Sequence, residues 1–325
     1  MLDRKRAIAA PALAVLAGAL LTWLGSPARA LDQLPVLAEW KSPDASGQTS
    51  GIAISRDGRY VLSGYYERAV LWDAQSGRPL SVLRGHTGDV VVAFLDGQRA
   101  ATADPKKGIM VWDIASGRQL SSRTLKNSDR LAAAPDSSRL ATAGFDDQAV
   151  RVWDAANGRQ VWMQDKLTGW PTGLTYSPDG KLVVTGQRTS ISLWDAASGA
   201  PVAKVALNSQ VWAVAVAPDN RIVAAAEPTA IRVIDIESKK ETGAIRSEGD
   251  PWFQDVAFLP SGRHVATADI KGQLLIGALA TREFVAKAPD SQVRSQRVAI
   301  APDGSRAYVG RANGSIQIID LASLR

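Results

Sequence analysis

From about residue 35 onward, hydrophobic and polar positions follow one pattern many times over. Short segments rich in Val, Ile, Thr and Ala are separated by turns that contain Gly, Pro, Asn or Asp. This combination is typical of β-strands joined by tight turns. One representative stretch has its apolar segments at residues 173–176, 181–185, 190–194 and 201–205. The pattern therefore predicts an all-β chain built from units of four short strands.

Two sequence markers indicate that this unit occurs seven times. The first is a Trp-Asp pair after the third segment, at 72–73, 112–113, 153–154 and 194–195, with weakened forms at 234–235, 276–277 and 319–320. The second is a turn that begins with Asp or Ser, at 57, 96, 136, 179, 219, 261 and 303, and leads to a basic residue. The first marker recurs every 40 to 43 residues and the second keeps in phase with it. Periods of this length indicate a stacked repeat architecture.

The two ends of the chain predict how the repeats close. A four-stranded sheet of this size cannot bury both of its faces alone, so neighbouring sheets must stack, and a closed ring removes the exposed ends. The last unit lacks a fourth segment because only five residues follow Asp320. Residues 34–40 resemble the missing strand. We therefore predict a single seven-bladed β-propeller of four-stranded antiparallel blades, closed by the N-terminal strand pairing with the last blade.

Several of these residues resemble the WD-repeat β-propellers. The Leu-Arg-Gly-His sequence at 83–86, followed by the Trp-Asp pair at 112–113, is similar to one Gly-His to Trp-Asp unit of that family. The Ser-Pro-Asp-Gly sequence at 177–180 resembles the family's inner-strand turn. Only one repeat keeps the Gly-His dipeptide, and the sixth repeat has lost its Trp-Asp pair. The resemblance covers residues 35–325 and implies the same propeller fold.

The resemblance also implies structural roles for individual residues. In this family the histidine bonds to a Ser or Thr on the second strand and to an Asp in the following turn. His86, Thr102 and Asp104 match those positions. The tryptophans of the third strands recur at one apolar position, which predicts core packing between blades rather than a binding site; they are Trp72, Trp112, Trp153 and Trp194.

The first 30 residues predict export. A basic start at Arg4-Lys5-Arg6 precedes an apolar run, and Ala28-Arg29-Ala30 has the small residues of a cleavage site. We therefore predict a signal peptide at 1–30, cleaved near Ala30/Leu31, and a periplasmic or secreted propeller at 31–325. The alternative is an uncleaved segment that anchors the protein in a membrane. Weakly apolar alanines and Pro11 disfavour this alternative.

Composition excludes several kinds of chemistry. The 325 residues include no Cys, which excludes disulfides, thiol nucleophiles and thiolate metal sites. The two His put a histidine-based triad or a three-histidine metal site almost out of reach. The 38 Lys and Arg exceed the 32 Asp and Glu by six. Four of these bases and one acid belong to residues 1–30, and the thirteen bases of the repeated turns and third-strand ends are nearly cancelled by twelve acids. The sequence thus predicts no nucleic-acid partner, and it predicts no catalytic, cofactor-binding or metal-binding residues.

A candidate contact surface lies on the face formed by the loops between blades. Trp170, Trp212 and Trp252 stand at or just before the innermost strands of three consecutive blades. Phe253 is beside the last of them, and Tyr66 and Arg188 lie in turns on the same side. Exposed tryptophans dominate the energetics of many protein contacts, so this arc predicts a partner-binding surface. The alternative is that these rings cover the central channel or pack beneath neighbouring loops.

These observations favour a rigid protein–protein interaction platform. It would be a monomeric propeller that binds one or more proteins and has no cofactor, no enzymatic activity and no membrane insertion after signal cleavage. The alternative from another class is a propeller enzyme, or a small-ligand or metal binder, with its site at the channel mouth. Such a site takes groups from several blades and leaves no linear motif.

Overall fold

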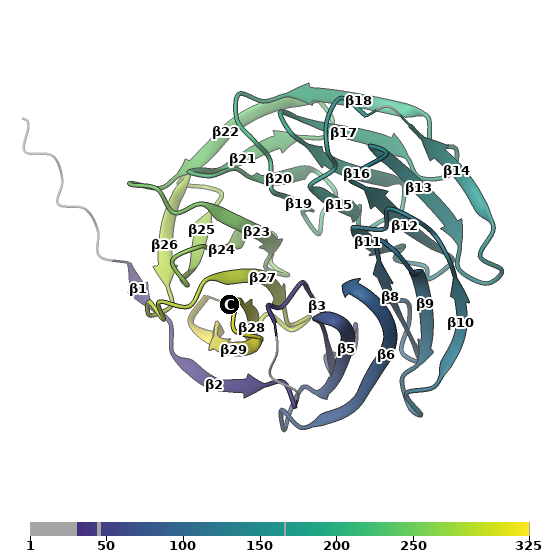
Figure 1. The fold of residues 1–325 in the computed structure, drawn as a ribbon. Helices are drawn as coiled ribbons and strands as arrows, with labels where there is room; N and C mark the ends of the chain where they lie inside the picture. The colour runs from purple at the N-terminus through teal and green to yellow at the C-terminus, as the bar shows by residue number, and fades with distance from the viewer. Residues whose placement is uncertain (1–30, 44–46, 166, 325) are drawn as a thin grey trace, which may run out of the picture. The chain divides into compact units, whose positions relative to one another are not determined.

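The described part of the chain forms a closed ring of seven β-sheets. A computed structural model of the protein describes residues 31–43, 47–165 and 167–324. Figure 1 shows the sheets fanned around a common centre, as predicted for a seven-bladed propeller. The predicted signal segment at 1–30 lies outside the described residues. The described chain has one short 3-10 helix, η1(Ala322–Leu324), and no helix long and apolar enough to span a membrane.

Blades one to four each contain four consecutive antiparallel strands, the first being innermost. Blade one comprises β3(Gly51–Ile54), β4(Tyr60–Gly64), β5(Tyr66–Asp73) and β6(Pro79–Asp89). Blade two comprises β7(Val91–Phe94), β8(Arg99–Asp104), β9(Gly108–Asp113) and β10(Gln119–Arg123). Blade three comprises β11(Arg130–Ala133), β12(Arg139–Gly144), β13(Ala149–Asp154) and β14(Gln160–Gln164). Blade four comprises β15(Gly173–Tyr176), β16(Leu182–Gln187), β17(Ser190–Asp195) and β18(Pro201–Ala206).

The remaining blades complete the ring, and two of them also use the N-terminal strands. Blade five comprises β19(Ala213–Val216), β20(Ile222–Ala226), β21(Ala230–Asp235) and β22(Lys240–Arg246). Blade six comprises β23(Phe253–Phe258), β24(His264–Asp269), β25(Leu274–Ala278), β26(Glu283–Lys287) and β1(Asp32–Gln33). Blade seven comprises β27(Ser295–Ile300), β28(Arg306–Arg311), β29(Ser315–Asp320) and β2(Val36–Lys41).

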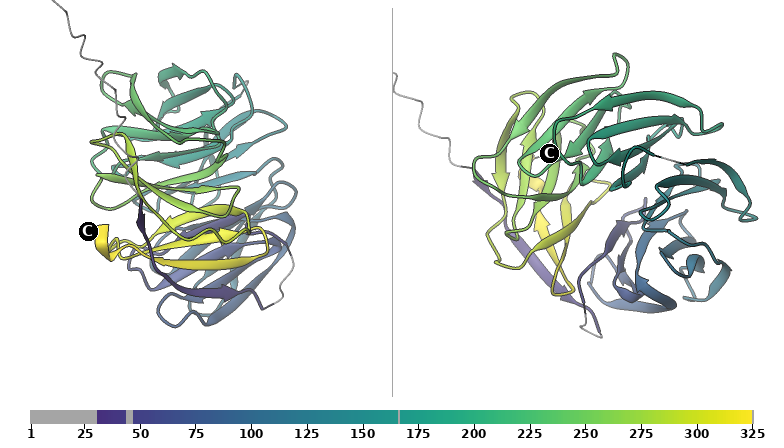
Figure 2. Two further views of the ribbon diagram at one scale, coloured as in Figure 1. Left: turned by 90° about the vertical axis from the view of Figure 1, so that its left-hand side faces the viewer. Right: turned by 45° about the horizontal axis from the view of Figure 1, so that its top comes forward.

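The predicted closure of the ring is confirmed. Strand β2 pairs antiparallel with β29, with Val36 opposite Ile319 and Trp40 opposite Ile316. Figure 2 shows β2, in purple, along the outer edge of the yellow blade seven. The N-terminal strand therefore supplies the fourth strand that the last repeat lacks.

Strand β1 adds a contact that the sequence did not predict. Asp32 and Gln33 pair in parallel with Ala286 and Lys287 at the outer edge of blade six. The next residue, Leu34, is 1% exposed and packs in the core between blades six and seven. Burial of this leucine holds the chain against blade six before it crosses to blade seven.

The core lies in the wedges between adjacent blades. Leu62 and Leu71 of blade one, for example, pack in one cluster with Met110 and Trp112 of blade two. In four blades the third-strand tryptophan donates its indole N–H to a hydroxyl of the second strand. The pairs are Trp72 with Ser63, Trp112 with Thr102, Trp153 with Thr142 and Trp194 with Thr185, at 2.7, 2.7, 2.9 and 3.0 Å.

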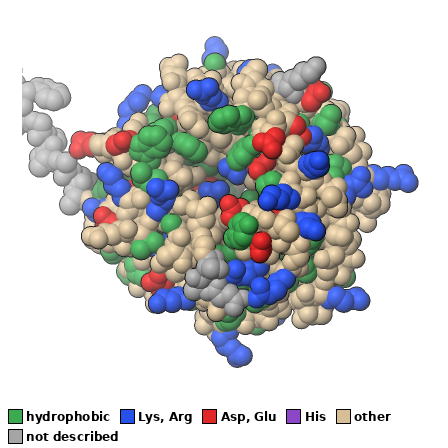
Figure 3. Space-filling model, in the orientation of Figure 1, with side chains coloured by type: hydrophobic (Ala, Val, Ile, Leu, Met, Phe, Trp, Pro, Cys, Tyr) green, Lys and Arg blue, Asp and Glu red, His purple; other side chains and the backbone are tan. Residues whose placement is uncertain are grey.

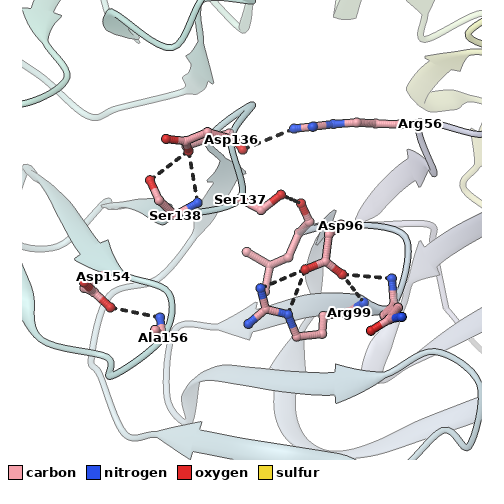
Figure 4. A network of polar contacts seen from close by, with 11 residues as sticks. Arg56, Asp96, Arg99, Asp136, Ser137, Ser138, Asp154 and Ala156 are labelled. Carbon is pink, nitrogen blue, oxygen red and sulfur yellow. Dashed lines mark hydrogen bonds and ion pairs between the residues drawn. The ribbon is translucent and has the colours of Figure 1, made fainter.

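Aspartates of the repeated turns cap their own backbones on the face opposite the inter-blade loops. Asp96 Oδ1 accepts the backbone N–H groups of Gln98 and Arg99, and Asp136 Oδ1 accepts that of Ser138 (Figure 4). Asp179 makes the same bond to Lys181, and Gly180 between them has φ +73°, a conformation that glycine adopts easily. The second sequence marker is thus a turn-forming device, since its carboxylate satisfies backbone donors that would otherwise lack partners.

Candidate functional site

The innermost strands of all seven blades line a central channel. A cavity of about 180 Å³ in this channel is bounded by residues of β3, β7, β11, β15, β19, β23 and β27. A second cavity of about 200 Å³ lies at the channel mouth, among the inter-blade loops of blades seven, one, two and three. Arg130 and Arg297 line both cavities. Figure 3 shows the face that carries this mouth, with acidic and basic side chains interspersed around a hollowed centre.

Arg130 and Arg297 make equivalent contacts on blades three and seven. Arg130 donates from Nε to the Thr172 carbonyl of blade four at 2.7 Å and from Nη1 to the Asp129 carbonyl at 2.9 Å. Arg297 donates from Nε to the Ser50 carbonyl of blade one at 3.0 Å and from Nη1 to the Gln296 carbonyl at 2.7 Å. Each guanidinium therefore ties its blade to the next blade around the channel.

The electrostatics of these side chains show that burial dominates. Burial, followed by the like charge of Arg297, lowers the pKa of Arg130 to about 9. Burial also raises the pKa of Asp255, although nearby Arg297 and two backbone N–H groups favour its charged form. Those N–H groups belong to Val256 and Val298 and lie 3.0 and 2.9 Å from the two carboxylate oxygens. The channel thus holds two cations and one carboxylate in a poorly solvated space.

Asp129 occupies the mouth beside Arg130. Its Oδ2 accepts the backbone N–H of Phe145 at 2.8 Å, and the guanidinium of Arg130 lies 4.8 Å from the centre of the Phe145 ring. Burial raises the pKa of Asp129, and the nearby carboxylates of Asp146 and Asp147 act in the same direction. The wall of the mouth therefore combines a cation, an aromatic ring and a carboxylate whose charge is disfavoured.

The predicted tryptophan arc divides into exposed and inward-facing members. Trp170 is 59% exposed and Trp252 is 39% exposed. Trp212 is half-buried, lines the channel cavity and lies with its ring centroid 6.3 Å from that of Trp252. Hydrophobic side chains gather over the loops of blades five and six on this face (Figure 3). The structure thus brings Trp212 and Trp252 together and leaves Trp170 exposed on blade four.

The prediction that Phe253 contacts a partner is wrong. Its side chain is 0% exposed and packs against Phe284 at 5.5 Å between ring centroids. Trp252, directly before it, has a φ of +50°, and Phe253 begins β23 with its ring in the core between blades five and six. Trp252 therefore stands before the strand and stays partly exposed, whereas the ring of Phe253 is buried.

The other two residues proposed for the contact surface are exposed. Tyr66 is 51% exposed and begins β5 in blade one, away from the tryptophans of blades four to six. Arg188 is exposed, and its carbonyl accepts the backbone N–H of Val211, next to Trp212, at 3.1 Å. Arg188 therefore lies beside the arc, whereas Tyr66 is separate from it.

His86, on β6 of blade one, belongs to a buried polar cluster whose other members lie in blade two. His86 Nε2 is 2.6 Å from Thr102 Oγ1, and the same hydroxyl accepts the indole N–H of Trp112. His86 Nδ1 lies 3.3 Å from Asp104 Oδ2, which also accepts the backbone N–H of Thr87. Burial lowers the pKa of His86, and Asp104 opposes this effect. In the part of the chain that the structure describes, no three acidic or histidine side chains gather as a possible metal site.

The comparison with protein families decides the family. Residues 146–323, more than half of the chain, match the family model described as outer membrane protein assembly factor BamB. The chain belongs to this BamB family. Residues 129–154 also match the model of the WD domain, G-beta repeat, which confirms the resemblance of the repeats to WD-repeat propellers. No curated protein matches the chain at a significant level.

Sequence reasoning missed the channel residues of this BamB-family propeller. Arg130, Arg297 and Asp255 lie at the start of innermost strands, in blades three, seven and six. One signal could have found two of them. Arg130 and Arg297 each stand early in an innermost strand, where most other repeats have a small or apolar residue. Only the closed ring places these two arginines beside the same cavity.

Proposed function

We propose that this protein is exported to the periplasm and acts as a rigid protein-interaction platform in outer membrane protein assembly. The family description names that process. The observation that supports a platform is the exposure of Trp170 and Trp252 on the face of the inter-blade loops. Large exposed rings on a rigid scaffold lose little conformational freedom on binding, which favours protein contacts.

The charge distribution supports a protein partner. The aspartates of the repeated turns accept backbone N–H groups and stand next to basic residues, so the bases of the opposite face alternate with acids. Exposed tryptophans on the loop face therefore provide the stronger attraction. We place the contact at Trp170, Trp252 and Arg188, with Trp212 supporting the ring of Trp252 from the channel side.

The test is in-cell cross-linking followed by mass spectrometry of the exported protein. The double variant Trp170→Ala and Trp252→Ala should lose its cross-linked partner while remaining folded by circular dichroism. The matched control is Leu80→Ala with Leu120→Ala, two residues of outer strands that are 48% and 45% exposed. If the tryptophan variant keeps every partner that the control keeps, the contact surface is not here.

Export is tested on the same sample. Mass spectrometry of the purified periplasmic protein should find an N-terminus at or next to Leu31. A full-length N-terminus in the membrane fraction would instead support the anchored alternative.

A further inference from the structure

The two channel arginines have hydrogen-bonding capacity that the protein does not use. In each of them Nε and Nη1 donate to backbone carbonyls, and Nη2 has no hydrogen-bond partner among the described residues. Neither guanidinium forms a salt bridge within 4.0 Å to a described carboxylate, in contrast to Arg151 and Arg232. Both side chains are half-buried and face cavities in the channel. A guanidinium is a strong, planar donor for oxyanions.

The nearby carboxylates do not take up this capacity. Both oxygens of Asp255 accept backbone N–H groups, and Oδ2 of Asp129 accepts that of Phe145. Asp89, at the mouth, accepts the hydroxyl of Ser50 at 3.1 Å. The lowered pKa of Arg130 agrees with this arrangement, because a well-paired guanidinium in the same space would hold its proton more firmly.

A third unused donor belongs to the same cavity wall. Trp212 lines the channel, and within the described chain its buried indole N–H has no hydrogen-bond partner. Buried donors are normally satisfied. The ring also gives one side of the cavity an apolar surface. Two guanidinium groups and the Trp212 ring therefore line one cavity, in which the guanidiniums provide the unused donors.

We propose that the central channel binds a small oxyanion, of the phosphate or short carboxylate class, between Arg130 and Arg297. The cavity of about 180 Å³ fits an anion of a few heavy atoms. It is smaller than the roughly 300–1,000 Å³ pockets of drug-sized ligands. The bound anion would bridge blades three and seven across the channel and so hold the ring more firmly. This site is distinct from the tryptophan contact surface, and the two can succeed or fail separately.

Isothermal titration of the mature protein with inorganic phosphate, and separately with succinate, tests the proposal at constant ionic strength. Wild type should bind at least one of the two saturably, with one site per chain. Arg130→Gln and Arg297→Gln should each weaken binding by about tenfold or more, because each removes a charged donor. The control Arg246→Gln, an exposed arginine at the end of β22, should bind as wild type does. Absence of saturable binding of both anions to wild type would overturn the proposal, and so would binding that survives in both glutamine variants.

A second variant keeps the test decisive if an arginine variant does not fold. Asp255→Asn removes the buried negative charge beside the two guanidiniums and should tighten anion binding. Unfolding cannot imitate a gain in affinity. Weaker or unchanged binding in folded Asp255→Asn would argue against an anion between these arginines.

Discussion

Trp40 of the N-terminal strand stacks on Trp72 of blade one, with ring centroids 5.7 Å apart and ring planes 27° from parallel. Trp40 also lies 5.6 Å from the ring of Tyr308 in blade seven. The turn at Gly77 leaves room for the Trp40 ring only because glycine has no side chain, since a Cβ there would lie 2.3 Å from the indole nitrogen of Trp40. The seam between the first and last blades is therefore closed by a side chain as well as by strand pairing.

Removing this ring should weaken the closed propeller. We expect Trp40→Ala to lower the free energy of unfolding by about 2–3 kcal/mol, because a half-buried aromatic contact between two blades is lost. Urea denaturation followed by fluorescence or circular dichroism measures the change. Leu37→Ala on the same strand is the control, since Leu37 is 49% exposed and should change stability by about 0.5 kcal/mol or less. Equal effects of the two variants would show that Trp40 does not close the seam.

The stability of the protein should fall as the pH drops below about 6.5. Burial lowers the pKa of His86 in the folded state below its ordinary value of 6.5, so the unfolded chain takes up a proton in this range that the folded chain does not. The stabilisation is complete above the unfolded pKa and is lost as the pH falls toward the folded pKa. Each such histidine contributes a slope of at most about 1.4 kcal/mol per pH unit.

The two histidines can be separated by mutation. The pKa of His264 is also lowered, by burial and then by Arg263, so His264→Gln should leave only the part of the decline that His86 causes. Adding His86→Gln should flatten the remaining dependence between pH 5.5 and 7.5, as chemical denaturation at each pH would show. A decline of the same slope in the double variant would assign it to other groups.

Two glycines should respond in opposite ways to a methyl group. Gly64 ends β4, and a Cβ there would lie 1.8 Å from the backbone carbonyl oxygen of Val90, in the segment that leads to blade two. We expect Gly64→Ala to cost about 3 kcal/mol, because backbone must move. Gly97 lies in a turn with no atom within 4 Å of its would-be Cβ. Gly97→Ala should be neutral or up to about 1 kcal/mol more stable. Thermal and urea denaturation of both variants measure these changes. Equal stability of Gly64→Ala and Gly97→Ala would contradict the prediction.

The parts of the fold that follow local rules could be predicted from the sequence. The turn that contains Asp179 forms because its carboxylate caps its own backbone. Trp194 donates to Thr185 of the neighbouring strand, and the equivalent tryptophans of three other blades make the same kind of bond. Such features repeat in the sequence because they repeat in the structure. Closure was predictable because a missing fourth strand and an extra first segment are both visible in the chain.

The parts that depend on assembled blades could not be predicted. Asp32 and Gln33 carry no hydrophobic pattern, and their parallel pairing follows from the burial of Leu34 between two blades. Arg130 and Arg297 each replace the small or apolar residue of most other repeats, but they are far apart in the sequence, and nothing in it places them beside one cavity. Their shared cavity exists only after seven blades have closed.

The neighbouring residues Trp252 and Phe253 give the sharpest test of which aromatic rings support the fold. Phe253→Ala should lower the free energy of unfolding by about 3–4 kcal/mol, because a fully buried ring leaves a cavity. Trp252→Ala should cost far less, since Trp252 is 39% exposed whereas Phe253 is fully buried. Trp252→Gly should be more stable than Trp252→Ala by about 0.5–1 kcal/mol, because a φ of +50° strains alanine and costs glycine little. Urea denaturation of the three variants should therefore rank Trp252→Gly above Trp252→Ala and both above Phe253→Ala. If Trp252→Ala proves as unstable as Phe253→Ala, the Trp252 ring supports the fold as a core residue and is not reserved for a partner contact.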